Sequence, residues 1–330
     1  MIPRRRQPRR AGSRGRTEAE AVPPVAGPPL RSWLFVPGDS ERKQDKALGS
    51  AADAVMLDLE DSVATAQLPA ARARVANLLR ARRPHGAPQL WVRPNAPSSG
   101  LLREDLETVF AGGAPAGIVL PKISAAAEVV AVARQLAALE TRIGVPSGST
   151  RLLIIGTETP AGVLALAQYP AAVGGVRALR QRLAGLTWGG EDLSAALGAL
   201  SQRDDTGALT FTFQLARTHC LLAAAALGVQ AIDGVCTDFR DAARLQHELD
   251  AARRDGFSGK LAIHPDQIAA INAAFAPTDA EREHALRVVA AFAAAPASGV
   301  ASLDGRMIDR PHLLQAQRIL AVAQRARNET

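Results

Sequence analysis

Residues 54–61 read AVMLDLED, a short apolar run that ends in a group of carboxylates. Runs of the same kind recur along the chain, and each is followed by a polar turn and a longer stretch rich in Ala, Leu and Arg. Several are apolar at nearly every position, which is typical of parallel strands that are covered on both faces. The eight runs occupy residues 32–36, 54–59, 89–92, 117–120, 152–155, 185–188, 231–235 and 261–263.

Helical patterns lie between these runs. Apolar residues are spaced three or four apart over residues 66–83, 124–139 and 241–254, as on one face of an α-helix. Eight strands alternating with helices predict an α/β fold, a TIM (β/α)8 barrel, over residues 29–275. A doubly wound open sheet, the main alternative, would favour a Gly-rich phosphate loop after its first strand. The first run ends instead in VPGD at residues 36–39.

The alternation of strands and helices stops near residue 276. The triplet PTD at residues 277–279 has the composition of a helix start, and residues 281–295 and 312–327 have the pattern of two further helices. The link at residues 299–309 is polar and contains Gly305, so no strand is expected there. Residues 276–330 are therefore predicted to form a C-terminal helical extension outside the barrel.

Positive charge is concentrated at the N-terminus. Residues 1–28 carry seven Arg and two Glu, so this predicted disordered basic tail accounts for +5 of the formal net charge of +7. The rest of the chain has too little positive charge to predict nucleic-acid binding. No apolar stretch approaches the ~20 residues of a membrane helix. Cys220 and Cys236 lack the spacing of a metal site, which favours reduced thiols in a cytoplasmic protein.

Polar residues follow the apolar runs at the strand ends where a TIM barrel carries its active site. Glu60 and Asp61 follow the second run, Glu158 the fifth and Asp192 the sixth. Carboxylates at this density repel one another unless a cation joins them, and a hard divalent ion such as Mg²⁺ meets that need with oxygen ligands. Arg93, after the third run, offers a planar fork for a substrate carboxylate or a developing oxyanion.

Several of these polar residues also have a structural interpretation. Asp192 could cap the helix that follows it, and the acidic pair after the second run could form an ordinary salt-bridged loop. Glu158 has no capping role, because Thr159 is the better cap and Pro160 the better first helical residue. Lys122, after the fourth run, could be the Schiff-base lysine of a metal-free aldolase, but nearby carboxylates would hold its amine protonated.

A series of short segments, in order and with the expected spacing from residue 31 to residue 320, resembles the HpcH/HpaI aldolase/citrate lyase family. The segments look most like the branch of citrate lyase β-subunit-like proteins, which includes malyl-CoA and citramalyl-CoA lyases. The sister branch of pyruvate-type aldolases carries a His shortly after the second-strand acidic pair, and this chain has none there. The segments are RSWLFVPG (31–38), DLEDSV (58–63), VRPN (92–95), LPK (120–122), ETPAG (158–162), GGEDL (189–193), GFSGK (256–260), IHP (263–265) and MID (307–309).

The resemblance implies roles for individual residues. Glu158 and Asp192 match the two protein ligands of the family's Mg²⁺, for which Mn²⁺ could substitute. Arg93 matches the arginine that holds the substrate's oxygens near the metal, with Glu60 and Asp61 orienting it or a metal-bound water. Contacts to the adenine and phosphates of an acyl-CoA substrate are implied for Phe35, Arg42 and Lys46.

The resemblance also implies an assembly and a reaction. Asp309 matches an aspartate that the C-terminal segment delivers into a neighbouring subunit's site, which implies a homotrimer or a hexamer. The expected activity is a Mg²⁺-dependent carbon–carbon lyase that cleaves or condenses a small β-hydroxyacyl-CoA of the citryl-, malyl- or citramalyl-CoA type. The products of cleavage would be an acetyl-CoA enolate and an oxo-acid. The alternatives are a pyruvate-type class II aldolase acting on a non-CoA substrate, or a non-catalytic barrel subunit.

Overall fold

The computed structural model describes residues 29–81, 84, 86–173, 175–295 and 299–327. The predicted basic tail, residues 1–28, lies outside the described residues, as does the end of the helix predicted to run to residue 83. Within the described ranges, no helix is both long enough and apolar enough to span a lipid bilayer.

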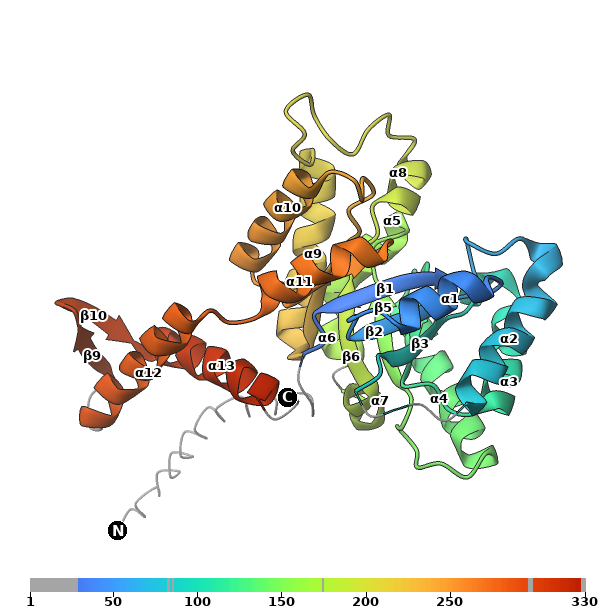
Figure 1. Cartoon of the computed structure of the whole chain (residues 1–330), viewed down its shortest axis with the longest axis horizontal. Helices are drawn as coiled ribbons and strands as arrows, with labels where there is room; N and C mark the ends of the chain where they lie inside the picture. The colour runs from blue at the N-terminus through green and yellow to red at the C-terminus, as the bar shows by residue number, and fades with distance from the viewer. Residues whose placement is uncertain (1–28, 82–83, 85, 174, 296–298, 328–330) are drawn as a thin grey trace, which may run out of the picture.

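Eight parallel strands close into a barrel in the order in which they occur in the chain, so the predicted TIM barrel is confirmed (Figure 1). Each strand pairs with the next, and β1 closes the ring against β8. The strands of the barrel are β1 Ser32–Pro37, β2 Ala54–Asp58, β3 Gln89–Arg93, β4 Gly117–Leu120, β5 Arg151–Ile155, β6 Leu183–Thr187, β7 Gln230–Asp233 and β8 Gly259–Ala262.

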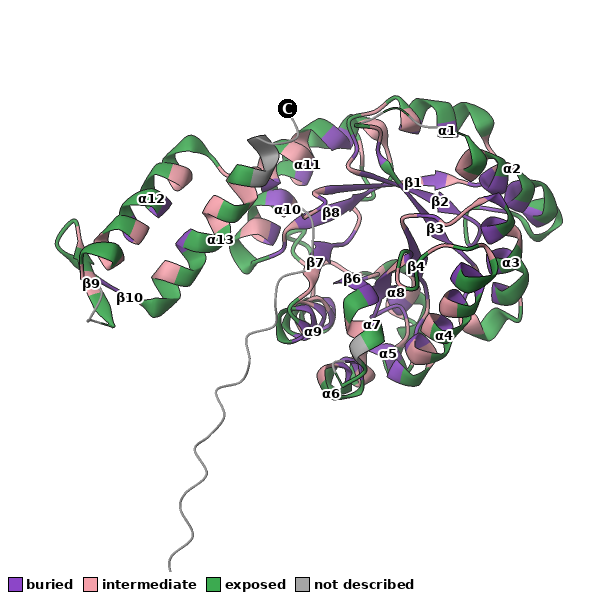
Figure 2. Cartoon of the chain, turned by 90° about the horizontal axis from the view of Figure 1, so that it is seen from below, coloured by how far each residue is buried: buried purple, intermediate pink, exposed green. Residues whose placement is uncertain are grey.

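Helices surround the barrel, and short 3-10 turns join several of them to the strands (Figure 2). Pro or a side-chain cap begins several of these elements, as where Thr159 accepts a hydrogen bond from the Gly162 amide at the start of α5. The helices up to residue 275 are α1 Glu41–Leu48, α2 Leu68–Arg80, α3 Leu102–Gly112, α4 Ala126–Arg142, α5 Pro160–Ala165, α6 Tyr169–Ala172, α7 Arg177–Arg182, α8 Glu191–Leu197, α9 Phe211–Leu227, α10 Ala242–Asp255 and α11 Ile268–Phe275.

The core has two layers because successive side chains of a strand point to opposite faces. On β2, Met56 belongs to a cluster that fills the inside of the barrel, whereas Val55 and Leu57 belong to the cluster between strands and helices. The inner cluster includes Trp33 and Trp91, whose rings meet edge to face with centroids 4.8 Å apart. The barrel is thus a packed core, which leaves the strand ends as the place for a site.

The C-terminal extension consists of two helices and a β-hairpin. The predicted helices are present as α12 Asp279–Ala294 and α13 Arg310–Arg327. The expectation that no strand lies between them is wrong, because β9 Val300–Leu303 and β10 Arg306–Asp309 pair antiparallel around Asp304 and Gly305, both at positive φ. The extension has its own small core of Ala285, Val288, Ile308 and Ala316, and it projects away from the barrel (Figure 1).

Candidate active site

A cavity of about 1060 Å³ opens at the carboxyl ends of the barrel strands. Its lining comes from residues that directly end or follow strands β1, β2, β3, β5, β6, β7 and β8, and from α1 and α8 beside them. Among the residues predicted from sequence, the lining includes Phe35, Arg42, Lys46, Asp61, Arg93, Glu158 and Asp192. The fold therefore brings the predicted residues of the barrel except Glu60 into the lining of one cavity, and Glu60 lies beside it, 3.1 Å from Arg93 Nη1.

Arg93, at the end of β3, is clamped by a carboxylate of the neighbouring strand. Asp58 accepts hydrogen bonds from Arg93 Nε at 2.6 Å and from Nη2 at 2.7 Å, and both side chains are buried. Burial raises the pKa of Asp58, but the hydrogen bonds and charge of Arg93 outweigh it and hold that pKa below its usual range. The Phe35 ring lies 4.8 Å from the guanidinium carbon. The arginine is thus fixed in orientation and always charged.

The acidic loop after β2 is tied to Lys122. The Lys122 ammonium contacts Glu60 Oε1 at 2.7 Å and Asp61 at 2.8 Å, while Glu60 Oε2 lies 3.1 Å from Arg93 Nη1. Burial lowers the pKa of Lys122, but its hydrogen bonds to Asp61 and Glu60 outweigh this and raise that pKa. The amine is therefore protonated, and a Schiff-base role for Lys122 does not fit the site.

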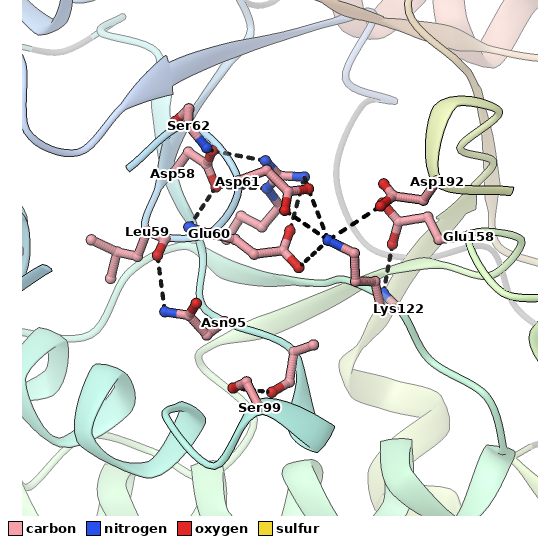
Figure 3. Close-up of polar contacts among 12 residues, drawn as sticks. Asp58, Leu59, Glu60, Asp61, Ser62, Asn95, Ser99, Lys122, Glu158 and Asp192 are labelled. Atoms are coloured by element: carbon pink, nitrogen blue, oxygen red, sulfur yellow. Dashed lines mark hydrogen bonds and ion pairs between the residues drawn. The ribbon is translucent and has the colours of Figure 1, made fainter. Parts of the chain in front are cut away.

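Lys122 also has an unusual backbone. Its φ of +51° lies in the left-handed region, which costs a non-glycine residue about 1–2 kcal/mol. This conformation lets the Lys122 amide donate a 2.5 Å hydrogen bond to Glu158 Oε2. The side chain of the same residue lies 3.4 Å from Asp192 Oδ1 (Figure 3). Lys122 therefore connects the acidic loop after β2 with both carboxylates predicted to bind metal.

Glu158, three residues beyond the end of β5, is buried at 4% exposure. Burial raises the pKa of Glu158 to about 8, although the Lys122 amide and Arg93 both lower it. The carboxylate fits closely against the loop after β6, because a Cβ atom on Gly189 would lie 2.7 Å from Glu158 Cγ. Thr159 caps α5, which leaves Glu158 free of a capping role, as the sequence predicts.

Asp192 lies in the first turn of α8, and the cap position is Gly190, which has no side chain to offer. The capping alternative for Asp192 therefore does not hold. Its side chain is one-third exposed and faces the same part of the cavity as Glu158 (Figure 3). The loop that leads into α8 is tightly packed, since a Cβ on Gly190 would meet Gln202 Oε1 at 2.4 Å.

The site carries more negative than positive charge. Asp58, Glu60, Asp61, Glu158 and Asp192 contribute five carboxylates. Two cationic side chains lie among them, Arg93 at the end of β3 and Lys122 in the loop after β4. Burial also raises the pKa of Glu60 to about 7, which reflects the cost of holding this charge. Because all five donors are carboxylate oxygens, the group has the chemistry to hold a hard divalent cation.

Glu158 and Asp192, the two residues predicted to bind metal, both line the cavity, and Lys122 contacts both of them. Within the described ranges, no group of three or more His, Cys, Asp or Glu side chains is arranged to hold a metal. A cation held by Glu158 and Asp192 would complete its coordination with water or with oxygens of a substrate. An open coordination sphere of this kind is typical of a catalytic rather than a structural metal.

Asp309 is a predicted site residue that the chain does not bring to its own cavity. It ends β10 at the far end of the extension, away from α1 and α8, which border the cavity (Figure 1). Its carboxylate is about half exposed and lies 2.5 Å from His312 Nδ1, on the first turn of α13. Phe35, Arg42 and Lys46 do line the cavity, on the side of β1 and α1.

Asp58 and a second charged cluster were not among the predicted site residues. A contact between Asp58 and Arg93 could have been predicted from the register of the strands, because the two residues lie opposite each other on β2 and β3. The second cluster lies behind the cavity wall, where buried Asp233 accepts a 2.7 Å hydrogen bond from Trp188 Nε1 and pairs with Lys260 at 3.0 Å. The segment GFSGK holds Lys260, but only the fold reveals its partner on β7.

Comparison with known proteins places this chain in a family. The family model described as HpcH/HpaI aldolase/citrate lyase matches residues 31–265, which cover the whole barrel up to the end of the segment IHP. The chain belongs to the HpcH/HpaI aldolase/citrate lyase family. The resemblance drawn from the short sequence segments is thereby confirmed.

Individual relatives match most of the length of the chain. A (3S)-malyl-CoA thioesterase of Cereibacter sphaeroides is 36% identical over 298 residues, which are 90% of this chain and 95% of that protein. The mitochondrial citramalyl-CoA lyase of Rattus norvegicus is 35% identical over 301 residues, 89% of this chain and 86% of that protein. The crystal structure of protein CitE from Mycobacterium tuberculosis in complex with magnesium, acetoacetate and coenzyme A has 35% identity and a TM-score of 0.70, covering 91% of this chain and 99% of that one.

Proposed function

We propose that this protein is a Mg²⁺-dependent carbon–carbon lyase that cleaves, or in reverse forms, a small β-hydroxyacyl-CoA. The observation that carries the proposal is the placement of Glu158 and Asp192 beside a clamped Arg93 in one cavity at the barrel mouth. Relatives named as a citramalyl-CoA lyase and a malyl-CoA thioesterase support CoA thioesters as the substrate class. The magnesium and coenzyme A in the CitE complex support the metal and the thiol carrier.

The site suits cleavage of a carbon–carbon bond that leaves an acetyl-CoA enolate and an oxo-acid, both of which carry negative charge. Glu158 and Asp192 would hold Mg²⁺, which supplies Lewis-acid stabilisation of charge on the substrate's oxygens when it is bound. Arg93, fixed by Asp58, adds a permanent positive charge at the same place, so little reorganisation is needed as charge develops. The substrate hydroxyl gives up its proton to water, and the bond between the α-carbon and the hydroxyl-bearing carbon breaks. The hydroxyl-bearing carbon becomes the carbonyl of an oxo-acid, and the α-carbon keeps the electron pair as an enolate.

The remaining residues bind the carrier and move a proton. Phe35, Arg42 and Lys46 line one side of the cavity, where an aromatic ring and two cations suit the adenine and phosphates of CoA. The enolate carbon then takes a proton, and we propose that Asp309 of a neighbouring subunit supplies it. This role follows from the family resemblance and from the distance of Asp309 from its own cavity (Figure 1).

We also propose an oligomeric state and a cellular compartment for the protein. A site completed by a neighbour's extension requires a closed ring of subunits, and we propose a homotrimer or a hexamer. We also propose a cytoplasmic protein, because both cysteines are buried free thiols, which suits a reducing compartment.

Turnover assays can test the proposed reaction. We expect the wild-type protein to convert malyl-CoA, citramalyl-CoA or citryl-CoA to acetyl-CoA and an oxo-acid with Mg²⁺ and to stop when EDTA removes the metal. Glu158→Gln and Asp192→Asn should lose this activity while keeping the circular dichroism spectrum of the fold. Parallel measurement of oxo-acid and of free thiol separates cleavage from the hydrolysis named for the Cereibacter relative. Release of thiol without oxo-acid, or full activity in EDTA, would refute the lyase.

A further inference from the structure

Lys122 lies at the centre of the acidic site and reaches carboxylates on two sides of it (Figure 3). Its ammonium contacts Glu60 and Asp61 at 2.7 and 2.8 Å on the side of β2, and Asp192 at 3.4 Å on the side of α8. The contact to Asp192 is the longest of the three, and Asp192 is also one of the two residues proposed to hold the metal. The ammonium therefore lies next to the place where the divalent cation would bind.

The backbone at Lys122 indicates that its side chain has a role of its own. The residue adopts φ +51°, and its amide donates to Glu158. Glycine would supply the same amide in this conformation without strain. The presence of lysine rather than glycine at this position is therefore explained by the charge of its side chain.

We infer that Lys122 is a resident counter-cation of the acidic site that competes with the divalent metal for Asp192. In the metal-free protein the Lys122 ammonium partly compensates the carboxylates of the site. When the metal binds, Asp192 turns from Lys122 to the ion, while the shorter contacts to Glu60 and Asp61 keep the ammonium beside the metal. Lys122 thereby weakens metal binding and is a positioning residue for the β2 loop. This inference rests on the proposed metal site.

Replacement of Lys122 is expected to strengthen metal binding. Removing Lys122 removes one positive charge that repels the ion and competes for a ligand, so metal affinity should rise. A residue that only holds the loops together would lower metal affinity when it is replaced. The direction of the change therefore separates the two roles, and it can be measured without substrate or turnover.

Binding of Mn²⁺ to the purified full-length protein, followed by the electron paramagnetic resonance signal of the free ion, provides the test. We expect Lys122→Met to bind Mn²⁺ more tightly than the wild type, on the order of tenfold, because one nearby unit charge is removed. Lys122→Arg keeps the unit charge and should retain the wild-type affinity to within about twofold. Lys43→Met is the matched control, because it removes the same charge from an exposed position on α1 at the rim of the same cavity. Its Mn²⁺ affinity should stay at the wild-type value.

A second measurement guards against a variant that folds poorly. Lys122→Gly removes both the charge and the backbone strain, and its Mg²⁺-dependent increase in melting temperature should exceed that of the wild type. Unchanged or weaker Mn²⁺ binding in both the Met and the Gly variants would overturn the inference about Lys122. If instead the wild type binds no Mn²⁺, or Glu158→Gln binds it equally well, the metal site itself is wrong and the proposed function fails with it.

Discussion

Arg93 has all three nitrogens of its guanidinium group within reach of carboxylates. Asp58 accepts hydrogen bonds from Nε and Nη2, and Glu60 lies 3.1 Å from Nη1. A bidentate pair of this kind fixes the plane of the arginine as well as its charge. At the scale of single residues, the function of Arg93 therefore depends on Asp58, which is not one of the two proposed metal ligands.

The variant Asp58→Asn tests this dependence. The amide keeps the shape of the side chain but loses the charge and one acceptor oxygen, so Arg93 is free to rotate. We expect kcat to fall roughly 10–100-fold, as is typical when a partner of an active-site residue is removed. Mn²⁺ affinity should change much less, because Asp58 is not a proposed ligand. Steady-state kinetics and metal titration of the same preparation measure both quantities, and an unaltered kcat would count against the clamp.

The raised pKa of Glu158 predicts how stability depends on pH. The folded-state value of about 8 lies above the ordinary value of 4.5, so the metal-free fold favours the protonated acid. The contribution of protonated Glu158 to the stability of the fold is fully present below pH 4.5 and is lost as the pH rises through about 8. Metal competes with that proton, so the Mg²⁺-dependent rise in melting temperature should be larger at pH 8.5 than at pH 6.

Melting curves recorded at both pH values, with and without Mg²⁺, check this prediction. Glu158→Gln provides the control, because glutamine cannot titrate and the difference between the two pH values should largely disappear. A Mg²⁺ effect on the wild type that is the same at both pH values would show that Glu158 does not exchange its proton for the metal.

At the scale of elements, the loop between β6 and α8 sets the position of Glu158. A methyl group on Gly189 would lie 2.7 Å from Glu158 Cγ and 3.3 Å from Ile155 Cγ2, so the glutamate side chain would have to move. We expect Gly189→Ala to weaken Mn²⁺ binding by about tenfold and to destabilise the fold by about 1–3 kcal/mol. Metal titration and thermal unfolding measure the two effects.

Gly49→Ala is the matched control for this loop. Gly49 ends α1 at φ −83°, and an added Cβ would meet only ordinary contacts at 3.5 Å or more. Its Mn²⁺ affinity should equal that of the wild type. Equal affinities in both alanine variants would mean that the loop leaves room for Glu158 to adjust.

The elements also show what the sequence could predict and what it could not. The barrel strands were predictable because their runs are apolar on both faces and recur between helices. The hairpin of β9 and β10 was not predictable from the sequence. Each of its strands has four residues and pairs with the other strand of the hairpin, and the two strands bury little beyond Ile308. In a segment this short, alternation of polar and apolar residues gives too weak a signal.

The same reasoning applies to the site. The pattern of residues after the strands predicted that Glu158, Asp192 and Arg93 share one cavity, because the carboxyl ends of parallel strands meet there. The contact of Lys122 with Asp192 joins residues 70 positions apart, on different loops. It depends on the left-handed turn at Lys122, and no local pattern in the sequence indicates that turn.

At the scale of the whole molecule, Asp309 lies on an extension that projects away from its own barrel (Figure 1). If a neighbour's extension completes each site, two inactive variants should restore activity to one another. Coexpression of Glu158→Gln with Asp309→Asn would place intact barrels beside intact extensions. A random one-to-one mixture should recover about a quarter of wild-type activity, because each site draws its two parts from different chains.

Differently tagged chains, purified through both tags in succession, allow this to be measured on mixed oligomers alone. Coexpression of Glu158→Gln with Asp192→Asn serves as the control, since both changes lie in the barrel and no combination yields an intact site. Mixed oligomers of the first pair that are no more active than either variant by itself would place the whole site within one chain.

The three tryptophans of the chain are divided between two environments. Trp33 and Trp91 are sealed inside the barrel at 0% exposure, where no ligand can reach them. Trp188 lines the cavity, and its indole N–H donates to Asp233. Any change of intrinsic fluorescence when a small molecule enters can therefore be assigned to Trp188. The native protein thus contains an optical reporter of occupancy, which needs neither a label nor an engineered chromophore.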